Sequence, residues 1–223
     1  MKCFKKTIAV IVAIVVSVMT FGCEGGYDAS GYTVAVLDLQ FQGDTKTART
    51  FVEGVTQSSL MEIYQEFIDD FVAGYITDGM EISDSETVQF SELTSAIFAS
   101  MRYEVGEAEK TGKREYEVPV VIWPSDTFIR YRQLLTEDSV KISEKVKNGL
   151  YPGSEEEIQN QVMAEIVSNA YELLMTAYEN SEYGGKKTVI LKVKAEKDGA
   201  YYIDEDDMDN LIVKILRLDE IGG

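Results

Sequence analysis

The 223-residue sequence has no histidine, only two cysteines, and far fewer basic than acidic side chains. Without histidine, a Ser-His-Asp triad and an HExxH metalloprotease site are excluded, and most zinc sites are excluded as well. Cys3 lies among the first six residues, inside the segment that has the pattern of a secretory signal, so Cys23 would be the single thiol of a mature exported chain. Such a chain has no disulfide framework, and its hydrophobic core must stabilise the fold.

The shortage of basic residues makes the chain strongly acidic. The 21 Lys and Arg residues are outnumbered by 39 Asp and Glu residues, and the net charge is −18. Nucleic-acid binding depends on Lys and Arg neutralising phosphates, so the sequence predicts no nucleic-acid partner. The same charge disfavours adsorption of the folded domain to anionic lipid. Its simplest role is solubility, and the functional alternative is an acidic patch for a cationic peptide or Ca²⁺.

The first residues have the pattern of a secretory signal. Lys2, Lys5 and Lys6 precede fifteen uncharged residues at positions 7–21. A basic start, a short apolar run and small residues at its end are typical of a signal peptide. A transmembrane helix needs about 20 apolar residues, which makes an uncleaved membrane anchor the weaker alternative.

The end of this segment resembles the lipobox of bacterial lipoprotein signals. Gly22 and Cys23 match the lipobox, while Thr20 and Phe21 stand where an aliphatic and a small residue are usual. The resemblance implies cleavage of signal peptide 1–22 between Gly22 and Cys23, and acylation of Cys23 with chains such as palmitate. Two acyl chains, at about 0.8 kcal/mol per buried CH₂, would anchor the protein stably in the cell membrane. We expect residues 23–31 to be a flexible tether.

The remaining residues, 32–223, predict one α+β domain. Helical periodicity, caps and strand alternation indicate the following elements in chain order: a helix over 60–76, a helix over 83–101, a hairpin over 102–110 and 114–124, helices over 126–148 and 154–182, a hairpin over 186–197 and 200–204, and a helix from 205. Residues 31–44 fit either a strand or a short helix. Pro119 has no N–H, so we place it at a sheet edge or a bulge.

Segregated helices and antiparallel strands are typical of the α+β class. We predict an antiparallel sheet of about four strands curled around the helix at 60–76, because that helix has a wide apolar face. The helix pair over 126–182 is then an insertion between two hairpins.

The overall pattern resembles a group of Gram-positive surface lipoproteins that carry a domain of unknown function with a cystatin-like or nuclear-transport-factor-like fold. The resemblance rests on the lipobox, VLDLQFQGDT, the YEV hairpin and KVKAEKDGAYYIDEDDMDNLI. It implies that residues 32–41 form a helix, and it supplies no catalytic residues.

Several side chains could form a site, each with a plainer interpretation. The acidic run at 204–209 does not have EF-hand spacing, and acids in the first turn of a helix stabilise its dipole. Trp123 could stack on a ligand, but packing is the commoner role. Asp69 and Asp70 point in different directions around a helix. Six tyrosines could line a pocket or simply pack: Tyr64, Tyr75, Tyr116, Tyr131, Tyr171 and Tyr178.

These observations favour a non-catalytic lipoprotein that binds or interacts at the extracytoplasmic face of the membrane. We expect no enzyme activity, no metal, no cofactor and no catalytic residue; the bilayer is the predicted partner, and a protein or small ligand stays unidentified. The alternative is an enzyme with a pocket in a cone-shaped fold and a buried carboxylate, for which Asp38, Asp69 and Glu104 are the candidates. A solute-binding transporter component is a third hypothesis, although the chain is short for two lobes.

Overall fold

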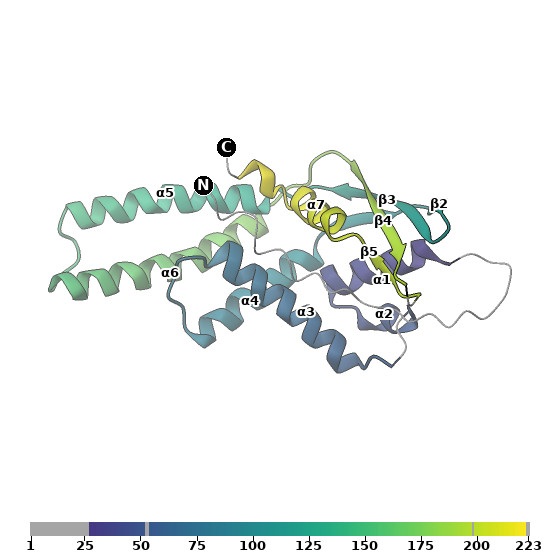
Figure 1. Cartoon of the computed structure of the whole chain (residues 1–223). Coiled ribbons are helices and arrows are strands. Elements are labelled where there is room, and N and C mark those ends of the chain that lie inside the picture. The colour runs from purple at the N-terminus through teal and green to yellow at the C-terminus, as the bar shows by residue number, and fades with distance from the viewer. Residues whose placement is uncertain (1–26, 52–53, 198, 222–223) are drawn as a thin grey trace.

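The computed structural model describes residues 27–51, 54–197 and 199–221, and within these ranges the chain is α+β (Figure 1). The helices are α1 (Ala29–Gln42), α2 (Thr45–Phe51), α3 (Gln57–Phe71), α4 (Asp84–Ala99), α5 (Thr127–Lys147), α6 (Glu155–Glu179) and α7 (Glu205–Ile215). A π-helical turn over Val72–Ile76 extends α3, and a 3-10 turn over Leu218–Glu220 follows α7.

One antiparallel sheet contains all the strands of the described residues: β1 (Arg102–Val105), β2 (Glu109–Gly112), β3 (Glu115–Trp123), β4 (Lys187–Ala195) and β5 (Tyr201–Ile203). Its order is β1-β3-β4-β5, and β2 pairs with β3 beyond the end of β1, so the sheet is four strands wide. On β3, Tyr116, Val118, Val120 and Ile122 alternate into the core, as the period of two predicts. The curled sheet confirms the predicted fold class and is consistent with a cystatin-like or nuclear-transport-factor-like fold.

A bulge around Gly106 separates β1 from β2. One extra residue is present on this side, because Val105 pairs with Val120 whereas Glu109 pairs with Glu117. Gly106 N–H donates to the Pro119 carbonyl at 2.7 Å, but proline has no N–H to return the bond. The Ser30 hydroxyl supplies it instead, donating to the Gly106 carbonyl at 3.0 Å. Pro119 therefore lies opposite a bulge, as the sequence predicted.

The helix against the sheet is α1, which corrects the prediction that the sheet curls around the helix at 60–76. α1 contacts β1 and β3 on one side and α3 and α4 on the other. Its apolar residues point in all directions, and Leu37, Leu39 and Phe41 are all buried. A helix that is apolar all round belongs inside, whereas the amphipathic α3 keeps one face in water.

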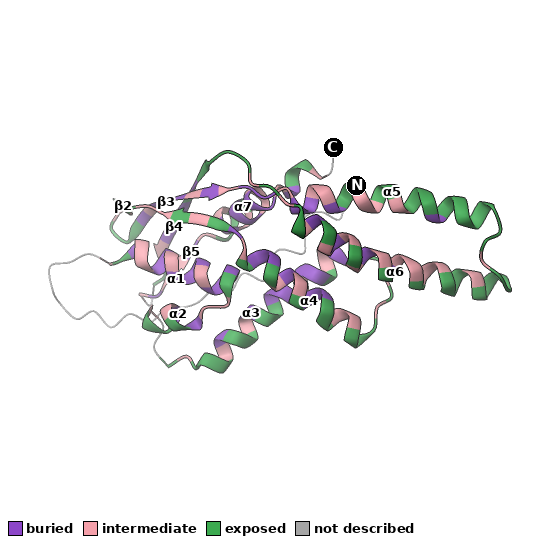
Figure 2. Cartoon of the chain, turned by 180° about the vertical axis from the view of Figure 1, so that it is seen from behind, coloured by how far each residue is buried: buried purple, intermediate pink, exposed green. Residues whose placement is uncertain are grey.

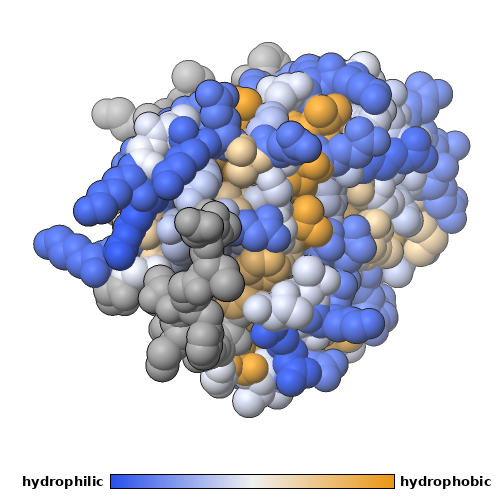
Figure 3. Space-filling view, turned by 90° about the vertical axis from the view of Figure 1, so that its right-hand side faces the viewer, coloured by the Kyte–Doolittle hydropathy of each residue, from blue (hydrophilic) through white to orange (hydrophobic). Residues whose placement is uncertain are grey.

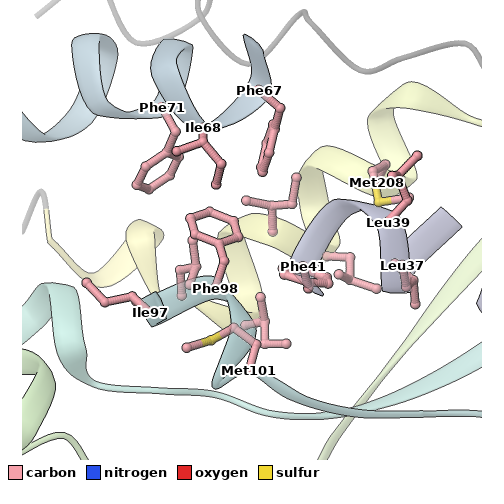
Figure 4. Packing of buried hydrophobic residues seen from close by; sticks show 14 of the residues in the cluster. Leu37, Leu39, Phe41, Phe67, Ile68, Phe71, Ile97, Phe98, Met101 and Met208 are labelled. Carbon is pink, nitrogen blue, oxygen red and sulfur yellow. The ribbon is translucent and has the colours of Figure 1, made fainter. Parts of the chain in front are cut away.

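A single hydrophobic cluster joins these layers. Phe98 of α4 packs edge-on against Phe67 and Phe71 of α3, with ring centroids 5.2 and 5.0 Å apart. On its other side Phe98 lies near Phe41 of α1, with ring centroids 5.7 Å apart. Figure 4 shows the Phe67 and Phe71 side chains directed at Phe98, and Met208 of α7 lying beside α1. α7 also contacts β4, so α1 and α7 together cover the buried face of the sheet.

The folded domain begins before residue 32, the start that the sequence predicted. The Asp28 carboxylate accepts from Gly31 N–H at 2.8 Å and caps α1. Tyr27 stacks on Tyr201, with ring centroids 3.6 Å apart. Residues 27–31 are thus part of the domain, and the predicted tether can extend at most to residue 26. Residues 1–26, including Gly22 and Cys23, lie outside the described residues.

The helices α5 and α6 form an antiparallel arm between β3 and β4, as predicted. The arm projects from the rest of the domain, and its outer half is largely exposed (Figures 1 and 2). Its base is closed by Asp126, whose carboxylate accepts from Glu182 N–H at 2.7 Å and pairs with Arg130 at 2.8 Å. At that base, Val167, Ala170 and Leu174 of α6 join the core.

Candidate functional site

An open groove of about 600 Å³ runs between α1 and the edge strand β1. This volume is in the range of ligand pockets. The lining residues come from α1, from the start of β1 and from the end of β3: Val34, Asp38, Gln42, Met101, Arg102, Tyr103, Glu104, Val105 and Trp123. Val34, Asp38 and Gln42 are spaced by four residues, so they form a single stripe on α1.

A short chain of hydrogen bonds connects the two walls of the groove. The Tyr103 hydroxyl donates to Asp38 Oδ1 at 2.5 Å, and the Gln42 amide donates to the Tyr103 oxygen at 3.1 Å. Burial, followed by the hydrogen bond to the Asp38 carboxylate, raises the pKa of Tyr103 far above its ordinary value. Tyr103 is therefore a protonated donor, and it fixes the orientation of the Asp38 carboxylate.

Two cation–π contacts lie at one end of the groove. The Lys186 ammonium lies 4.6 Å from the centroid of the Trp123 ring, and the Arg102 guanidinium carbon lies 4.0 Å from that of Tyr183. The Tyr183 hydroxyl also donates to the Ser100 carbonyl at 2.6 Å. Trp123 packs under Lys186 and borders the groove, and its stacking on a ligand stays a prediction.

The three carboxylates considered for catalysis do not meet at one place. Asp38 and Glu104 both line the groove, the first half-buried and the second exposed. Asp69 belongs to a different surface, where it accepts from Ser91 at 2.6 Å and from Gln65 at 2.9 Å. Asp69 therefore joins α3 to α4.

The acidic run at the start of α7 forms structural contacts. Asp204 precedes the helix and pairs with Lys194 at 2.5 Å, but its side chain makes no capping hydrogen bond. Asp207 accepts from Lys192 N–H at 3.0 Å, which covers part of the β4 edge that β5 leaves unpaired. Glu205, Asp206 and Asp207 occupy the first helical turn, as the sequence predicted. Within the described ranges, no three Asp, Glu, Cys or His residues form a group that could hold a metal ion.

The six candidate tyrosines do not line the groove. Tyr64, Tyr116 and Tyr131 are buried in the core, and Tyr75, Tyr171 and Tyr178 pack around it. The tyrosine of the groove is Tyr103, which no pattern in the sequence singled out. The available signal was its position on the inward face of the 102–110 strand, but its partner Asp38 is 65 residues away.

Among residues 27–51, 54–197 and 199–221, no helix is long and apolar enough to cross a membrane.

Comparison with known proteins gives one informative likeness, in fold. Neither a protein-family model nor a curated protein sequence matches this chain. Among solved structures it is similar to YcdA, a candidate lipoprotein from Bacillus subtilis subsp. subtilis str. 168, with a TM-score of 0.52 and 16% sequence identity. The match covers 85% of this chain and 56% of that chain. At this identity the likeness establishes a shared fold.

Proposed function

We propose that this protein is a lipid-anchored extracytoplasmic lipoprotein whose folded domain is a non-catalytic binding module. The Gly22-Cys23 lipobox supports the anchor, and the similarity in fold to a candidate lipoprotein of Bacillus subtilis is consistent with it. The observation that carries the binding role is the groove between α1 and β1, with its fixed Asp38–Tyr103 pair.

The chemistry of that pair favours recognition over catalysis. The phenol of Tyr103 already donates to Asp38, and its raised pKa keeps the proton on the phenol at neutral pH. A general acid or base works best with a pKa near the working pH. The groove is also open to solvent, whereas the enzyme alternative calls for a buried carboxylate. The pair is better suited to holding a ligand than to moving a proton.

Anchoring through Cys23 would set the orientation of the domain. Four peptide units separate Cys23 from Tyr27, so their Cα atoms can be at most about 14 Å apart. α1 begins at the end of the molecule opposite the arm (Figure 1). Seen from that end, the rim is hydrophilic and a band of hydrophobic side chains crosses the middle (Figure 3). The start of α1 would then lie close to the bilayer, and the arm would point away from it.

The test of the anchor is a pair of cysteine variants produced in a Gram-positive host. Cys23→Ala removes the acylated sulfur, so we expect unprocessed protein with no lipid-modified N-terminal peptide by mass spectrometry. Cys3→Ala is the matched control, since Cys3 lies in the segment that is cleaved away, and it should be processed and acylated normally. If Cys23→Ala is still cleaved after Gly22 and stays membrane-bound, the lipoprotein assignment is wrong.

A further inference from the structure

The outer edge of β1 carries backbone groups that no other described element uses. Gly106 N–H bonds to the Pro119 carbonyl at 2.7 Å, which makes this a hydrogen-bonded pair of the β1–β3 ladder. Hydrogen-bonded and non-hydrogen-bonded pairs alternate in an antiparallel ladder. The N–H and C=O groups of Glu104 therefore face β3, whereas those of Tyr103 and Val105 face away from the sheet. Within the described residues β1 is an edge strand.

These outward groups open into the groove that α1 borders. Residues 101–105 form one wall of the groove, and the stripe of Val34, Asp38 and Gln42 forms the other. An edge strand beside a helix can accept an extended peptide, whose main chain continues the sheet while its side chains contact the helix. β1 has four residues, so it can pair with a segment about 13 Å long.

The charge of the groove selects the kind of peptide. Asp38 and Glu104 both line it, and the Arg102 guanidinium is already engaged on the Tyr183 ring at 4.0 Å. Tyr103 holds Asp38 Oδ1, and no other described residue forms a hydrogen bond with the Asp38 carboxylate. The net charge of −18 would also attract a cationic partner.

We propose that an extended peptide segment carrying a Lys or Arg side chain binds this groove by adding to β1 as a further strand. Its main chain pairs with Tyr103 and Val105, and its cationic side chain reaches the Asp38 carboxylate. This inference rests on the proposed binding role and specifies the class of partner.

The test uses the full chain in detergent and a library of random blocked heptapeptides. We expect the enriched peptides to contain Lys or Arg and to lack proline at the centre. A resynthesised binder should protect the Tyr103 and Val105 amides from hydrogen exchange. The Glu104 amide, already directed at β3, should change little. Absence of enrichment, or protection confined to another part of the domain, would overturn the proposal.

Two protein variants and one modified peptide separate the main-chain contribution to peptide binding from the contribution of the Asp38 charge. Val105→Pro removes an outward N–H without removing a bond to β3, and Asp38→Asn removes charge at nearly constant shape. Each should weaken binding about tenfold, because each removes one charged or main-chain partner of the peptide. Asp70→Asn, a half-buried residue of α3, is the matched control and should bind normally. Every second amide of the added strand donates to β1. N-methylation of these amides should abolish binding, whereas N-methylation of the other set should leave it intact.

Equal binding of peptides N-methylated in either register would rule out strand addition, as would equal binding by wild type and Val105→Pro. Free lysine amide that competes as well as the peptide would also overturn the proposal. No membrane is involved in these measurements, so their failure leaves the Cys23 anchor untouched. Loss of acylation in Cys23→Ala, conversely, leaves the groove intact.

Discussion

Among the carboxylates of the described residues, Asp209 has the least favourable surroundings. Its Oδ1 atom is buried and has no hydrogen-bond partner. Burial, followed by the nearby carboxylates of Glu205 and Asp206, raises its pKa to about 6. The same carboxylate contributes, after burial, to the raised pKa of Tyr75. The folded protein therefore binds a proton at Asp209 more tightly than the unfolded chain does, whose carboxyl has a pKa near 3.9.

The variant Asp209→Asn should be more stable than the wild type at pH 8. At that pH the wild-type carboxylate is ionised and desolvated, whereas the amide carries no charge. As the pH falls through 6 toward 4, the wild type gains the proton that the fold favours, and the advantage of the variant should disappear. Urea unfolding of both proteins between pH 4.5 and 8 measures this difference. A constant difference across that range would contradict the assignment.

The arm formed by α5 and α6 divides into an inner and an outer part with different energetic roles. Leu174 on the inner part is 0% exposed and belongs to the core, whereas Leu150 beyond the end of α5 is 63% exposed. The outer part buries Ile142 of α5 and carries polar contacts, in which Glu165 accepts from Lys145 at 2.5 Å and from Tyr151 at 2.7 Å. Exposed ion pairs of this kind contribute little to stability.

The same substitution at two positions tests this division. Leu174→Ala should lower the free energy of unfolding by about 2–5 kcal/mol, because it leaves a cavity where α6 meets the core. Leu150→Ala should change it by less than about 0.5 kcal/mol. Both values come from urea unfolding followed by far-UV circular dichroism. Similar losses for the two variants would mean that the outer arm packs more tightly than the structure indicates.

At the scale of the whole molecule, the dominant feature is negative charge. The net charge is −18, and it becomes −21 if the signal segment with its three lysines is removed. Like charges on a compact surface repel one another, and salt screens that repulsion. We expect the urea midpoint at pH 7.5 to rise as NaCl increases from about 20 to about 500 mM. Near pH 4.4, the sequence pI, the rise should vanish. A midpoint that falls with salt at pH 7.5 would show that the surface ion pairs outweigh the repulsion.

The local elements follow from the sequence because their causes are local. Ser83 and Ser154 form capping boxes that begin α4 and α6, close to the helix starts that the sequence predicted at residues 83 and 154. The inward face of β3 follows the period of two, and Pro119 sits opposite a bulge because it has no N–H. Each of these features depends on residues that are near one another in the chain.

The tertiary structure decided which helix covers the sheet and where a site could form. An apolar periodicity identifies a face to be buried but not the partner that buries it, so α3 was predicted in the place that α1 occupies. The Asp38–Tyr103 hydrogen bond spans 65 residues and needs both α1 and the β1 edge in position. The sequence by itself determined most helices and strands after residue 60, the α+β class and the excess of negative charge, whereas residues 31–44 fitted either a strand or a helix. The groove exists only after folding, because long-range packing brings together residues of α1 and β1 whose local sequence patterns do not predict that they meet.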